Sequence, residues 1–520
     1  MDEPQPASPP PGADVAPEEP AAPAAAGRAR TSRAGLGARI WRRSRDWVDD
    51  LTGFSSLIGP ILRHPVPRAR KSAWLFVLGS ATLFVFLLQI VTGIALASAY
   101  VPSSGQAYLT LQFIDSTKLG AIVRGLHYFG ASAMVILVGV HAIRVYLMAS
   151  YKYPRQLNWL TGVVLLFLTL GMAFTGQLLR WDQNGFWSAV VGAEQAGRTP
   201  FIGNWFGHFV LAGDTAGGAT LSRFFAAHVF FIPALIFLFL AIHLYLVLHH
   251  GISEPPQAGR KVDRRTYRQW YHALLAREGE PFWPNAAWRD AVFGVIVIAI
   301  VFALAVMIGA PAVNAPPDPT IIGASPRPDW YLLWYYALLS VLPRWIENYV
   351  IILAPLIFIV LLVALPFAAP GGERSPLRRP WSLFIVAGIV VTIAFYTHLG
   401  SLAPWSPRFD AAPLPASVVG VKYGPVALGA GVYYEKGCEY CHRISGYGGI
   451  RGPDLSDVGD RLTADQITTR IFSGAANMPS YTGNMTPDEL SLLLAFLESR
   501  HIVPPATAAP AGAAPGGNHP

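Results

Sequence analysis

The stretch from Arg124 to Tyr146, RGLHYFGASAMVILVGVHAIRVY, places two histidines in an apolar segment long enough to cross a membrane. His127 and His141 stand 14 residues apart, which returns them to nearly the same face of an α-helix, about 21 Å apart. Ionisable side chains are costly inside a membrane and usually mark a functional site. The spacing suits ligands of two stacked metal centres, although two hydrogen-bonded core histidines would give the same pattern.

A second apolar segment, from Arg223 to His250, favours the metal centres. Its His228 and His243 stand 15 residues apart, again on roughly one face of a helix. In the neighbouring spans, glycines repeat the spacing of 14 residues: Gly79 with Gly93, and Gly162 with Gly176. Isolated glycines in membrane helices commonly serve helix packing, but a glycine also lets a flat macrocycle approach the backbone. The combined pattern predicts four helices that hold two haems, each iron ligated by histidines from both sides.

The composition is that of a membrane protein, because 52% of the 520 residues are hydrophobic and only 13% are charged. Seven apolar runs are long enough to span a bilayer, at roughly 73–99, 124–148, 158–179, 225–248, 290–310, 348–369 and 381–400. We therefore expect an all-α fold. It is a membrane helical bundle of about seven helices with a four-helix di-haem core, followed by a small all-α domain.

If the N-terminus is placed inside, most lysine and arginine residues fall in connections that are also inside. By the positive-inside rule, this charge distribution sets the orientation. The rule also explains most of the net charge of +8, so the basic residues give no reason to expect nucleic acid as a partner. In this orientation His127 and His228 hold the outer haem. His141 and His243 hold the inner haem.

Three arginines near the ends of these helices are candidates for pairing with haem propionates. They are Arg124 and Arg223 at the outer ends and Arg144 at the inner end. Arginines at such positions are also common as plain interfacial anchors, so both interpretations stay open.

Changes in composition divide the chain into seven segments. They are a Pro/Ala-rich and basic N-terminal segment (1–45), the four-helix di-haem core (46–250), an inner loop (251–289), a three-helix part (290–401), a Pro-rich linker (402–425), a soluble domain (426–502) and a tail (503–520). Segments rich in Pro and Ala cannot bury a core, so we expect the N-terminal segment and the tail to be disordered. The basic stretch from Arg28 to Arg45 is a candidate to lie on the membrane surface.

The soluble segment carries the only two cysteines of the chain, in the motif Cys438-Glu-Tyr-Cys441-His442. C-x-x-C-H is the attachment motif of a c-type haem, in which two thioether bonds hold the porphyrin and the histidine ligates the iron. A zinc site would need two further ligands, and a thioredoxin-like site would need a βαβ unit; the sequence shows neither. We therefore predict one covalent haem c in a c-type cytochrome domain.

The second axial ligand of such a haem is usually a methionine or a histidine. Met478 and Met485 are the candidates. Met485 directly precedes Thr486-Pro-Asp-Glu489, the start of a helix with a capping box, where it would pack on Leu490 as a hydrophobic staple. This leaves Met478 as the predicted iron ligand.

Two long outer connections flank the outer haem. Residues 180–222 are rich in aromatic residues and glycine, which favours short amphipathic helices at the membrane surface. The connection 311–347 holds Asp329 beside Trp330 and Tyr331. An acid at this depth is usually just solvated, but one that faces the outer haem between aromatic residues can accept a proton from a substrate.

These residues resemble the cytochrome b family of bc-type quinol–cytochrome c oxidoreductases over residues 60–400. The first part is similar to the plastid type of this cytochrome b in its histidine spacing and in the motifs at 89–93, 220–223 and 250–253. The motifs at 282–285 and 328–331, with the last three spans, resemble the separate subunit four of that type. Residues 426–502 resemble class I c-type cytochromes, including Gly452-Pro-Asp-Leu455 and Met478-Pro479.

Three positions depart from the family pattern. The quinol-oxidation motif usually begins Pro-Glu but here reads Pro328-Asp329, one methylene shorter. Arg180 stands where the family has a proline, beside the expected quinol pocket. Val77 stands where plastid-type proteins carry the cysteine that attaches an extra haem, so that haem should be absent.

The resemblance implies the cytochrome b subunit of a quinol-oxidising respiratory or photosynthetic complex. Asp329, Trp330 and Tyr331 would form the outer quinol site, with a low-potential quinol such as menaquinone as the candidate substrate. One electron would pass inward through the two b haems, and the other would reach the c haem through a Rieske iron–sulfur partner. Protons would be released outside. His249 or His250 would contact the inner quinone unless they are ordinary interfacial histidines.

The implied setting is a bacterial plasma membrane, with the N-terminus inside and the c-type domain on the outer, periplasmic side. The chain would form a homodimer within a larger complex that passes electrons to a downstream acceptor. Two other functions use the same histidines: a non-bifurcating di-haem relay between a dehydrogenase and the fused cytochrome c, and a haem-based redox sensor. The motif at 328–331 and the loop 180–222 argue against the relay. No kinase, cyclase or DNA-binding segment supports the sensor.

Overall fold

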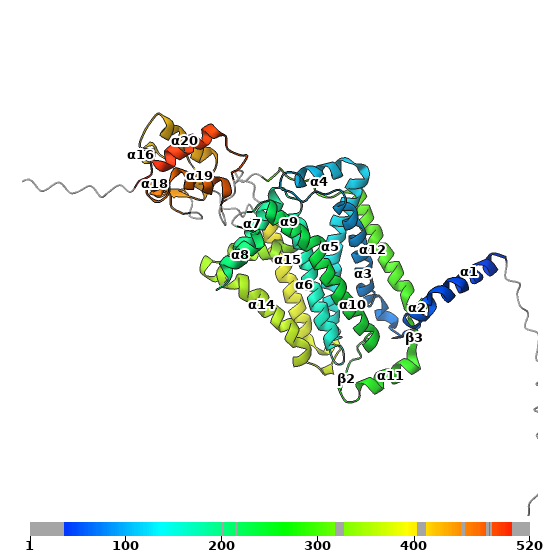
Figure 1. The fold of residues 1–520 in the computed structure, drawn as a ribbon. Helices are drawn as coiled ribbons and strands as arrows, with labels where there is room; N and C mark the ends of the chain where they lie inside the picture. Colours follow the sequence, from blue (N-terminus) through cyan, green and yellow to red (C-terminus); the bar gives the residue numbers. More distant parts are fainter. Residues whose placement is uncertain are drawn as a thin grey trace, which may run out of the picture. The chain divides into compact units, whose positions relative to one another are not determined.

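The computed structural model describes residues 36–199, 201–213, 216–317, 327–402, 412–448, 453–474, 478 and 481–501 (Figure 1). Most of the expected disordered N-terminal segment, much of the Pro-rich linker, the C-terminal tail, Gly452 and Pro479 lie outside the described residues. The chain divides into two compact units, Met1–Pro60 and Ile61–Pro520.

The first unit contains helix α1 (Leu36–Thr52) and most of α2 (Phe54–Leu62). Ile40, Trp47 and Leu51 are exposed on α1 and share one face by the helical period. Arg42 and Arg45 lie on the opposite side of the same helix. An apolar face opposite basic residues is typical of a helix that lies on a membrane surface, so this remains the prediction for the basic segment.

Seven helical segments of the described chain are long and apolar enough to cross a membrane, which confirms the predicted number. They are α3 (Leu78–Ala97), α5 (Lys118–Leu147), α6 (Gln156–Leu178), the run of α9 (Gly218–Ala226), η2 (Ala227–Phe231) and α10 (Ile232–His250), η3 (Phe282–Ala286) with α12 (Ala287–Met307), α14 (Arg344–Ala368), and α15 (Pro380–Leu402). Large apolar side chains such as Val91, Val295 and Phe384 are exposed on them. Such surfaces suit lipid rather than water.

The helices α3, α5, α6 and α10 form the four-helix core, with α3 packed along α5 and α6 along α10. A cluster of buried apolar residues lies within it: Leu78, Ala81, Val85, Phe86, Met134, Leu137 and Ile236. Around the core, α12 packs on α3 and α5, α14 on α6, and α13 (Trp330–Val341) on α15. Small residues permit these approaches, since a Cβ added to Gly125 would lie 3.0 Å from the Cβ of Ala305.

The connections gather at the two ends of the bundle (Figure 1). The α7 end carries α4 (Ala107–Ser116), α7 (Gln183–Gly197), α8 (Gly203–Leu211) and the start of α13. The α11 end carries η1 (Arg70–Leu75), α11 (Tyr267–Glu278), η5 (Pro376–Arg378) and two antiparallel strand pairs. The pairs join β1 (Pro65–Pro67) to β3 (Gly279–Pro281) and β2 (Lys261–Val262) to β4 (Gly372–Glu373). Helices α7 and α8 confirm the short helices expected within 180–222.

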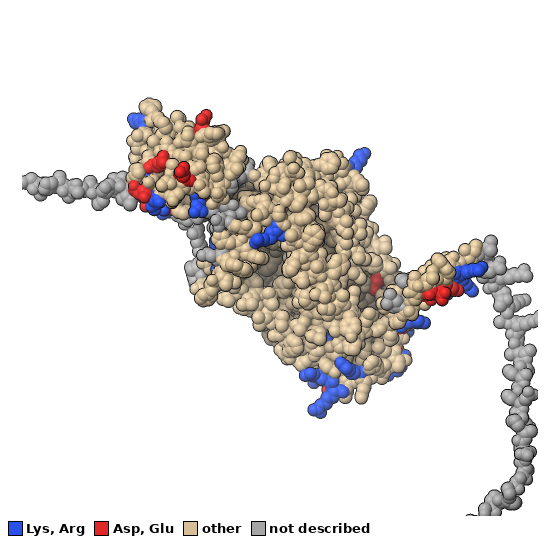
Figure 2. All heavy atoms as spheres, viewed as in Figure 1, with Lys and Arg blue, Asp and Glu red and all other residues tan. Residues whose placement is uncertain are grey.

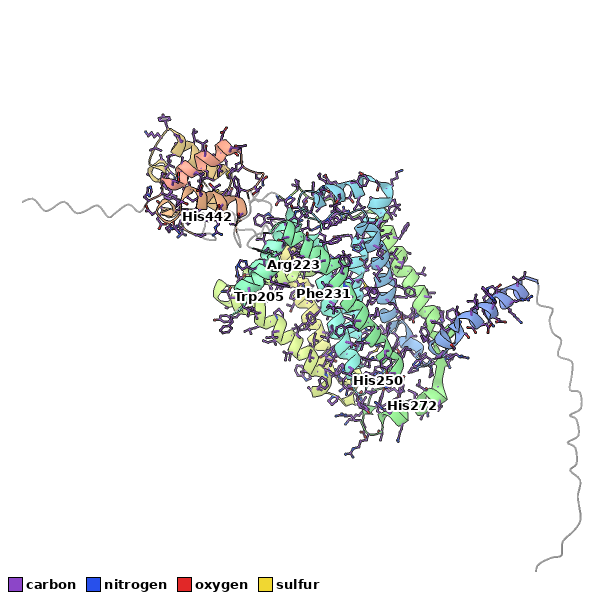
Figure 3. All side chains as sticks on the ribbon, viewed as in Figure 1. Trp205, Arg223, Phe231, His250, His272 and His442 are labelled. Atoms are coloured by element: carbon purple, nitrogen blue, oxygen red, sulfur yellow. The ribbon has the colours of Figure 1, made fainter. Side chains whose placement is uncertain are left out.

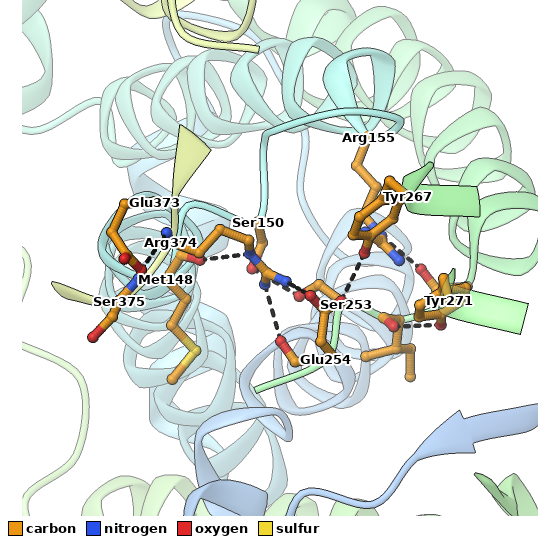
Figure 4. A network of polar contacts seen from close by, with 12 residues as sticks. Met148, Ser150, Arg155, Ser253, Glu254, Tyr267, Tyr271, Glu373, Arg374 and Ser375 are labelled. Carbon is orange, nitrogen blue, oxygen red and sulfur yellow. Dashed lines mark hydrogen bonds and ion pairs between the residues drawn. The ribbon is translucent and has the colours of Figure 1, made fainter. Parts of the chain in front are cut away.

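A buried network of polar side chains ties the first four spans to the last three at the α11 end (Figure 4). Arg374 forms an ion pair with Glu254, and their side chains are only 4% and 7% exposed. Glu254 also accepts a hydrogen bond of 2.6 Å from the Tyr267 hydroxyl, which accepts one of 2.7 Å from Arg155. Arg155 donates a further bond of 2.9 Å to the carbonyl of Gly251. Four segments that are distant in sequence are therefore held together by groups that would be costly to leave unpaired.

The C-terminal helices surround a core of their own. Helix α17 (Pro425–Glu435) packs on α20 (Pro487–Glu498), and Tyr433, Leu493 and Phe496 are almost fully buried between them. The other elements are α16 (Ala416–Val419), η6 (Cys438–Tyr440), the pair β5 (Arg443–Ile444) and β6 (Tyr447–Gly448), α18 (Val458–Arg461) and α19 (Ala464–Ser473). The capping box expected at Thr486 and Glu489 is confirmed by both of its hydrogen bonds.

Candidate haem and quinol sites

His127 on α5 and His228 in η2 face each other near the α7 end of the bundle. Their ring centres are 6.3 Å apart, and the ring planes make an angle of 76°. A histidine nitrogen binds a metal such as zinc at about 2 Å, so two imidazoles on opposite sides of one metal have their nitrogens about 4 Å apart. The ring centres then lie farther apart by the two ring radii. The observed separation therefore suits one iron between the rings.

His141 and His243 form a second level toward the α11 end and lie close enough to interact electrostatically. Each of the four histidines faces one of the predicted glycines. A Cβ added to the glycine would lie 3.2 Å from the ring for Gly93 and His127, 3.3 Å for Gly79 and His141, 2.7 Å for Gly176 and His228, and 3.5 Å for Gly162 and His243. The missing side chains leave room beside each ring, so the residues of both levels fit the predicted haems.

Threonines orient three of these four rings. The hydroxyls of Thr92, Thr175 and Thr161 lie 2.9, 3.0 and 2.8 Å from Nδ1 of His127, His228 and His243. Each hydroxyl also donates to the backbone carbonyl four residues earlier in its own helix. It is thus an acceptor toward Nδ1–H, which leaves Nε2 without a proton and free to bind a metal.

The three candidate arginines differ in their contacts. The Arg124 guanidinium donates to the Asp115 carboxylate at 2.5 Å. Arg223 is exposed on α9 and contacts the carbonyl and the ring of Phe209 (Figure 3). Arg144 has two buried nitrogens without a hydrogen-bond partner among the described residues. Of the three arginines, Arg144 therefore has the greatest need of an anion that the protein chain itself does not supply.

Asp329 directly precedes α13, and its neighbours come from α13 and from the end of α6. Its carboxylate lies 3.2 Å from the hydroxyl of Tyr331 and 3.7 Å from a guanidinium nitrogen of Arg180, at the end of α6. Its backbone N–H donates to the side-chain oxygen of Gln177 at 3.0 Å. Burial and the nearby Asp329 carboxylate raise the pKa of Tyr331 above its ordinary value. Tyr331 is therefore a protonated hydrogen-bond donor at neutral pH.

Two buried donors beside Asp329 have no hydrogen-bond partner in the described structure: Gln177 Nε2 and Arg180 Nε. Trp330 is satisfied elsewhere, because its indole N–H donates to the Ser132 hydroxyl on α5 at 3.2 Å. A buried donor without a partner is costly. The two free donors therefore mark a place for a ligand that carries an acceptor oxygen.

In the C-terminal domain, Cys438 lies in η6 and Cys441 directly follows it, the two form no disulfide, and His442 is buried beside them (Figure 3). Nδ1 of His442 lies 2.8 Å from the carbonyl oxygen of Pro453, so Nδ1 carries the proton and Nε2 is free for iron. Burial lowers the pKa of His442 below its usual range, which keeps the ring neutral. Met478 packs against the core of this domain, and so does Met485. These residues fit a covalently bound haem.

Three families match successive parts of the chain. Residues 132–317 match the family described as cytochrome b(N-terminal)/b6/petB, residues 316–414 that described as cytochrome b(C-terminal)/b6/petD, and residues 425–497 that described as cytochrome c oxidase, cbb3-type, subunit III. The menaquinol:cytochrome c reductase cytochrome b subunit of Bacillus subtilis (strain 168) is 38% identical over 218 residues, 40% of this chain and 97% of that protein. The chain belongs to the cytochrome b family.

Other relatives agree with this assignment. Cytochrome b6 of Heliobacterium mobile is 39% identical over 212 residues, which are 40% of this chain and 99% of that protein. The cytochrome bc complex cytochrome b subunit of Chlorobaculum thiosulfatiphilum is 32% identical over 305 residues, 58% of this chain and 66% of that protein. A solved hyperthermophilic respiratory Complex III has a TM-score of 0.58 at 25% identity, covering 69% of this chain and 91% of that chain.

This cytochrome b is therefore a multi-pass membrane protein of electron transport and an oxidoreductase subunit of a bc-type complex. It carries haem b in the bundle and haem c in the C-terminal domain, which is part of the same chain. The resemblance found in the sequence is confirmed.

Sequence reasoning missed several residues that support these sites in the cytochrome b. A signal for the threonines existed, because each directly precedes one of the four glycines, at 92–93, 161–162 and 175–176. Gln177 carried no such signal, since its contact with Asp329 joins residues 152 positions apart. Pro453 belongs to the motif at 452–455, but its role as acceptor for His442 becomes visible only when the loop is folded.

Proposed function

We propose that this cytochrome b is the quinol-oxidising subunit of its bc-type complex. The observation that carries the proposal is that a proton-accepting group lies next to the His127/His228 level at the α7 end. Tyr331 and Asp329 bond to Ala173 and Gln177, which flank Thr175, the threonine that orients His228. Oxidation of a quinol releases protons and electrons at one place, so acceptors for both are needed side by side.

Asp329 is the proposed proton acceptor. Its carboxylate oxygens can accept hydrogen bonds, and the Tyr331 hydroxyl, which donates to the carbonyl of Ala173 at 2.9 Å, shares its proton with the carboxylate at 3.2 Å. The unpaired donors of Gln177 and Arg180 are available for an oxygen of the substrate. The carboxylate would take the proton of the quinol hydroxyl and pass it toward the surface at the α7 end.

The histidines define two routes for the electrons. One electron would cross the bundle from the His127/His228 level to the His141/His243 level and reduce quinone at the α11 end, near His249 or His250. The other would reach the C-terminal domain, at His442 and Met478, through a Rieske iron–sulfur partner and then leave to a downstream acceptor. When bound, the two b haems and the c haem supply one-electron carriers at these positions. Arg144 is the proposed partner of an inner haem propionate.

The charge distribution supports an inside location for the α11 end. On the face shown in Figure 2, lysine and arginine gather there, while the flank of the bundle is almost bare of charge. Lys261, Arg264 and Arg268 are exposed members of this group. By the positive-inside rule, the N-terminus is inside a bacterial plasma membrane and the α7 end and the c-type domain are outside. Protons released at Asp329 would then build a proton gradient.

Menaquinol is the proposed substrate. A relative that is 38% identical is named menaquinol:cytochrome c reductase cytochrome b subunit. The relatives are subunits of larger assemblies, so we also propose a homodimer within a complex that contains the Rieske protein.

Purification of the chain with its partners from native membranes tests this function. We expect an iron–sulfur protein to co-purify, and the preparation to reduce its haems on addition of a menaquinol analogue. Haem reduction by a dehydrogenase without any response to quinol would instead support a di-haem relay.

A further inference from the structure

The two departures from the family pattern at the α7 end lie against each other. Arg180 and Asp329 form an ion pair with a closest nitrogen–oxygen distance of 3.7 Å, although 149 positions separate them in the chain. Each side chain is 16% exposed, so solvent screens the pair only in part. At this site, an aspartate in place of the longer glutamate of the family thus occurs together with an arginine in place of the family's proline.

The position of Arg180 is held from both sides. The carbonyl before it, that of Leu179, accepts a hydrogen bond of 2.6 Å from the Tyr100 hydroxyl. After it, the fully buried Asp182 accepts bonds from the backbone N–H groups of Gly185, at 2.8 Å, and Asn314, at 3.1 Å. A turn tied at both ends presents the guanidinium to Asp329 without much freedom to leave it.

The charged surroundings of Asp329 are simple in the part of the chain that the structure describes. Arg180 reaches it from the end of α6, Tyr331 from α13, and Tyr128 from α5 lies within electrostatic range. Arg124 also lies near Tyr128 but is paired with Asp115. Among the described residues, Arg180 is therefore the cation paired with this carboxylate.

We propose that Arg180 is a binding and positioning residue for quinol oxidation: its guanidinium holds the Asp329 carboxylate turned toward α6, and its unpaired Nε–H, together with Gln177 Nε2, binds the quinol oxygen. This inference rests on the function proposed above. As a quinol O–H bond breaks, a carboxyl O–H bond forms on Asp329. The second proton leaves to the aqueous phase, and the two electrons leave by the two routes already described.

A consequence follows for the kinetics. A carboxylate that is held in place by a cation is already oriented to accept the proton of the substrate. Removing the cation should therefore lower kcat by about tenfold, which is a part of the roughly 10²–10⁴-fold that a general base contributes.

The test compares Arg180→Gln and Arg180→Lys with the unchanged protein in the purified complex, measuring kcat and KM for a menaquinol analogue. We expect the loss of kcat in the Gln variant and most of the original kcat in the Lys variant, because lysine keeps the charge. Arg180→Gln combined with Asp329→Asn should cost less than the sum of the two single losses in free energy, since part of the effect of Arg180 passes through the same carboxylate. Arg198→Gln is the matched control, because Arg198 pairs with Glu347 at 2.9 Å and not with Asp329.

A second readout does not depend on turnover. In infrared spectra without quinol, the carboxylate band that is lost in Asp329→Asn should change its frequency in Arg180→Gln, because the carboxylate loses its paired cation. An unchanged band together with an unchanged kcat would overturn the role of Arg180 and leave quinol oxidation standing. Failure of the unchanged protein to oxidise quinol would overturn the proposed function, while the infrared comparison would still decide whether the pair acts as described.

Discussion

At the scale of single residues, Asp329 is the group on which the proposed proton transfer depends. Asp329→Asn keeps the size of the side chain and its contact with Tyr331 but removes the acceptor charge. We expect quinol oxidation to slow by about 10²–10⁴-fold, the usual contribution of a general base. The b and c absorption spectra should not change, because Asp329 is not an iron ligand. Steady-state quinol-dependent reduction of a cytochrome c acceptor checks the rate, and unchanged turnover would remove Asp329 from the mechanism.

The histidine pairs make a prediction at the same scale. His127→Leu and His228→Leu each remove one ligand of the same level, so each variant should lose one b haem and keep the other b haem and the c haem. Pyridine haemochrome spectra and redox titration of the purified protein measure this. His249→Leu on α10 is the matched control and should keep every haem. Loss of both b haems from either single variant would show that the two levels are not independent.

At the scale of elements, the network at the α11 end joins the first four spans to the last three through the buried pair of Arg374 and Glu254. Arg374→Ala would leave Glu254 buried and unpaired, and we expect a loss of about 3–5 kcal/mol in stability. The double variant Arg374→Met with Glu254→Leu should lose less, because no charge stays buried alone. Heating of the purified protein, followed by its haem absorbance, measures both.

A control pair lies nearby on α11. Arg277 and Glu278 are 3.0 Å apart but are 72% and 56% exposed. Arg277→Ala should therefore change the melting temperature little, since an exposed pair contributes at most about 1 kcal/mol. Equal destabilisation by the Arg374 and Arg277 variants would mean that the buried network does not hold the two parts of the bundle together.

At the scale of the whole molecule, haem count and sidedness are linked. Two histidine pairs and one C-x-x-C-H motif predict b and c haem at two to one. Seven crossings among the described residues, an odd number, predict that the c-type domain lies on the side opposite the N-terminus. Haemochrome analysis measures the ratio, and protease added to sealed right-side-out vesicles should cut off the c-type domain. A second covalent haem would contradict the assignment at Val77, and a protected domain would reverse the orientation.

The sequence by itself determined the architecture of this cytochrome b. Helical periodicity is local, so the spacings between His127 and His141 and between His228 and His243 already predict two stacked levels. The length of the apolar runs predicts seven crossings, and Cys438-x-x-Cys441-His442 is a contiguous motif that needs no fold to be read. The capping box at Thr486 and Glu489 was predictable for the same reason.

Only the tertiary structure decided which side chains complete the sites. The threonines meet Nδ1 of the histidines across helix interfaces, and Gln177 and Arg180 reach Asp329 from a segment about 150 positions away. Arg124 and Arg144 look alike in the sequence, yet Arg124 is paired with Asp115, while two buried nitrogens of Arg144 have no hydrogen-bond partner in the part of the chain that the structure describes. Such contacts depend on the packing of helices that are distant in the chain, and no local spacing records which faces will meet.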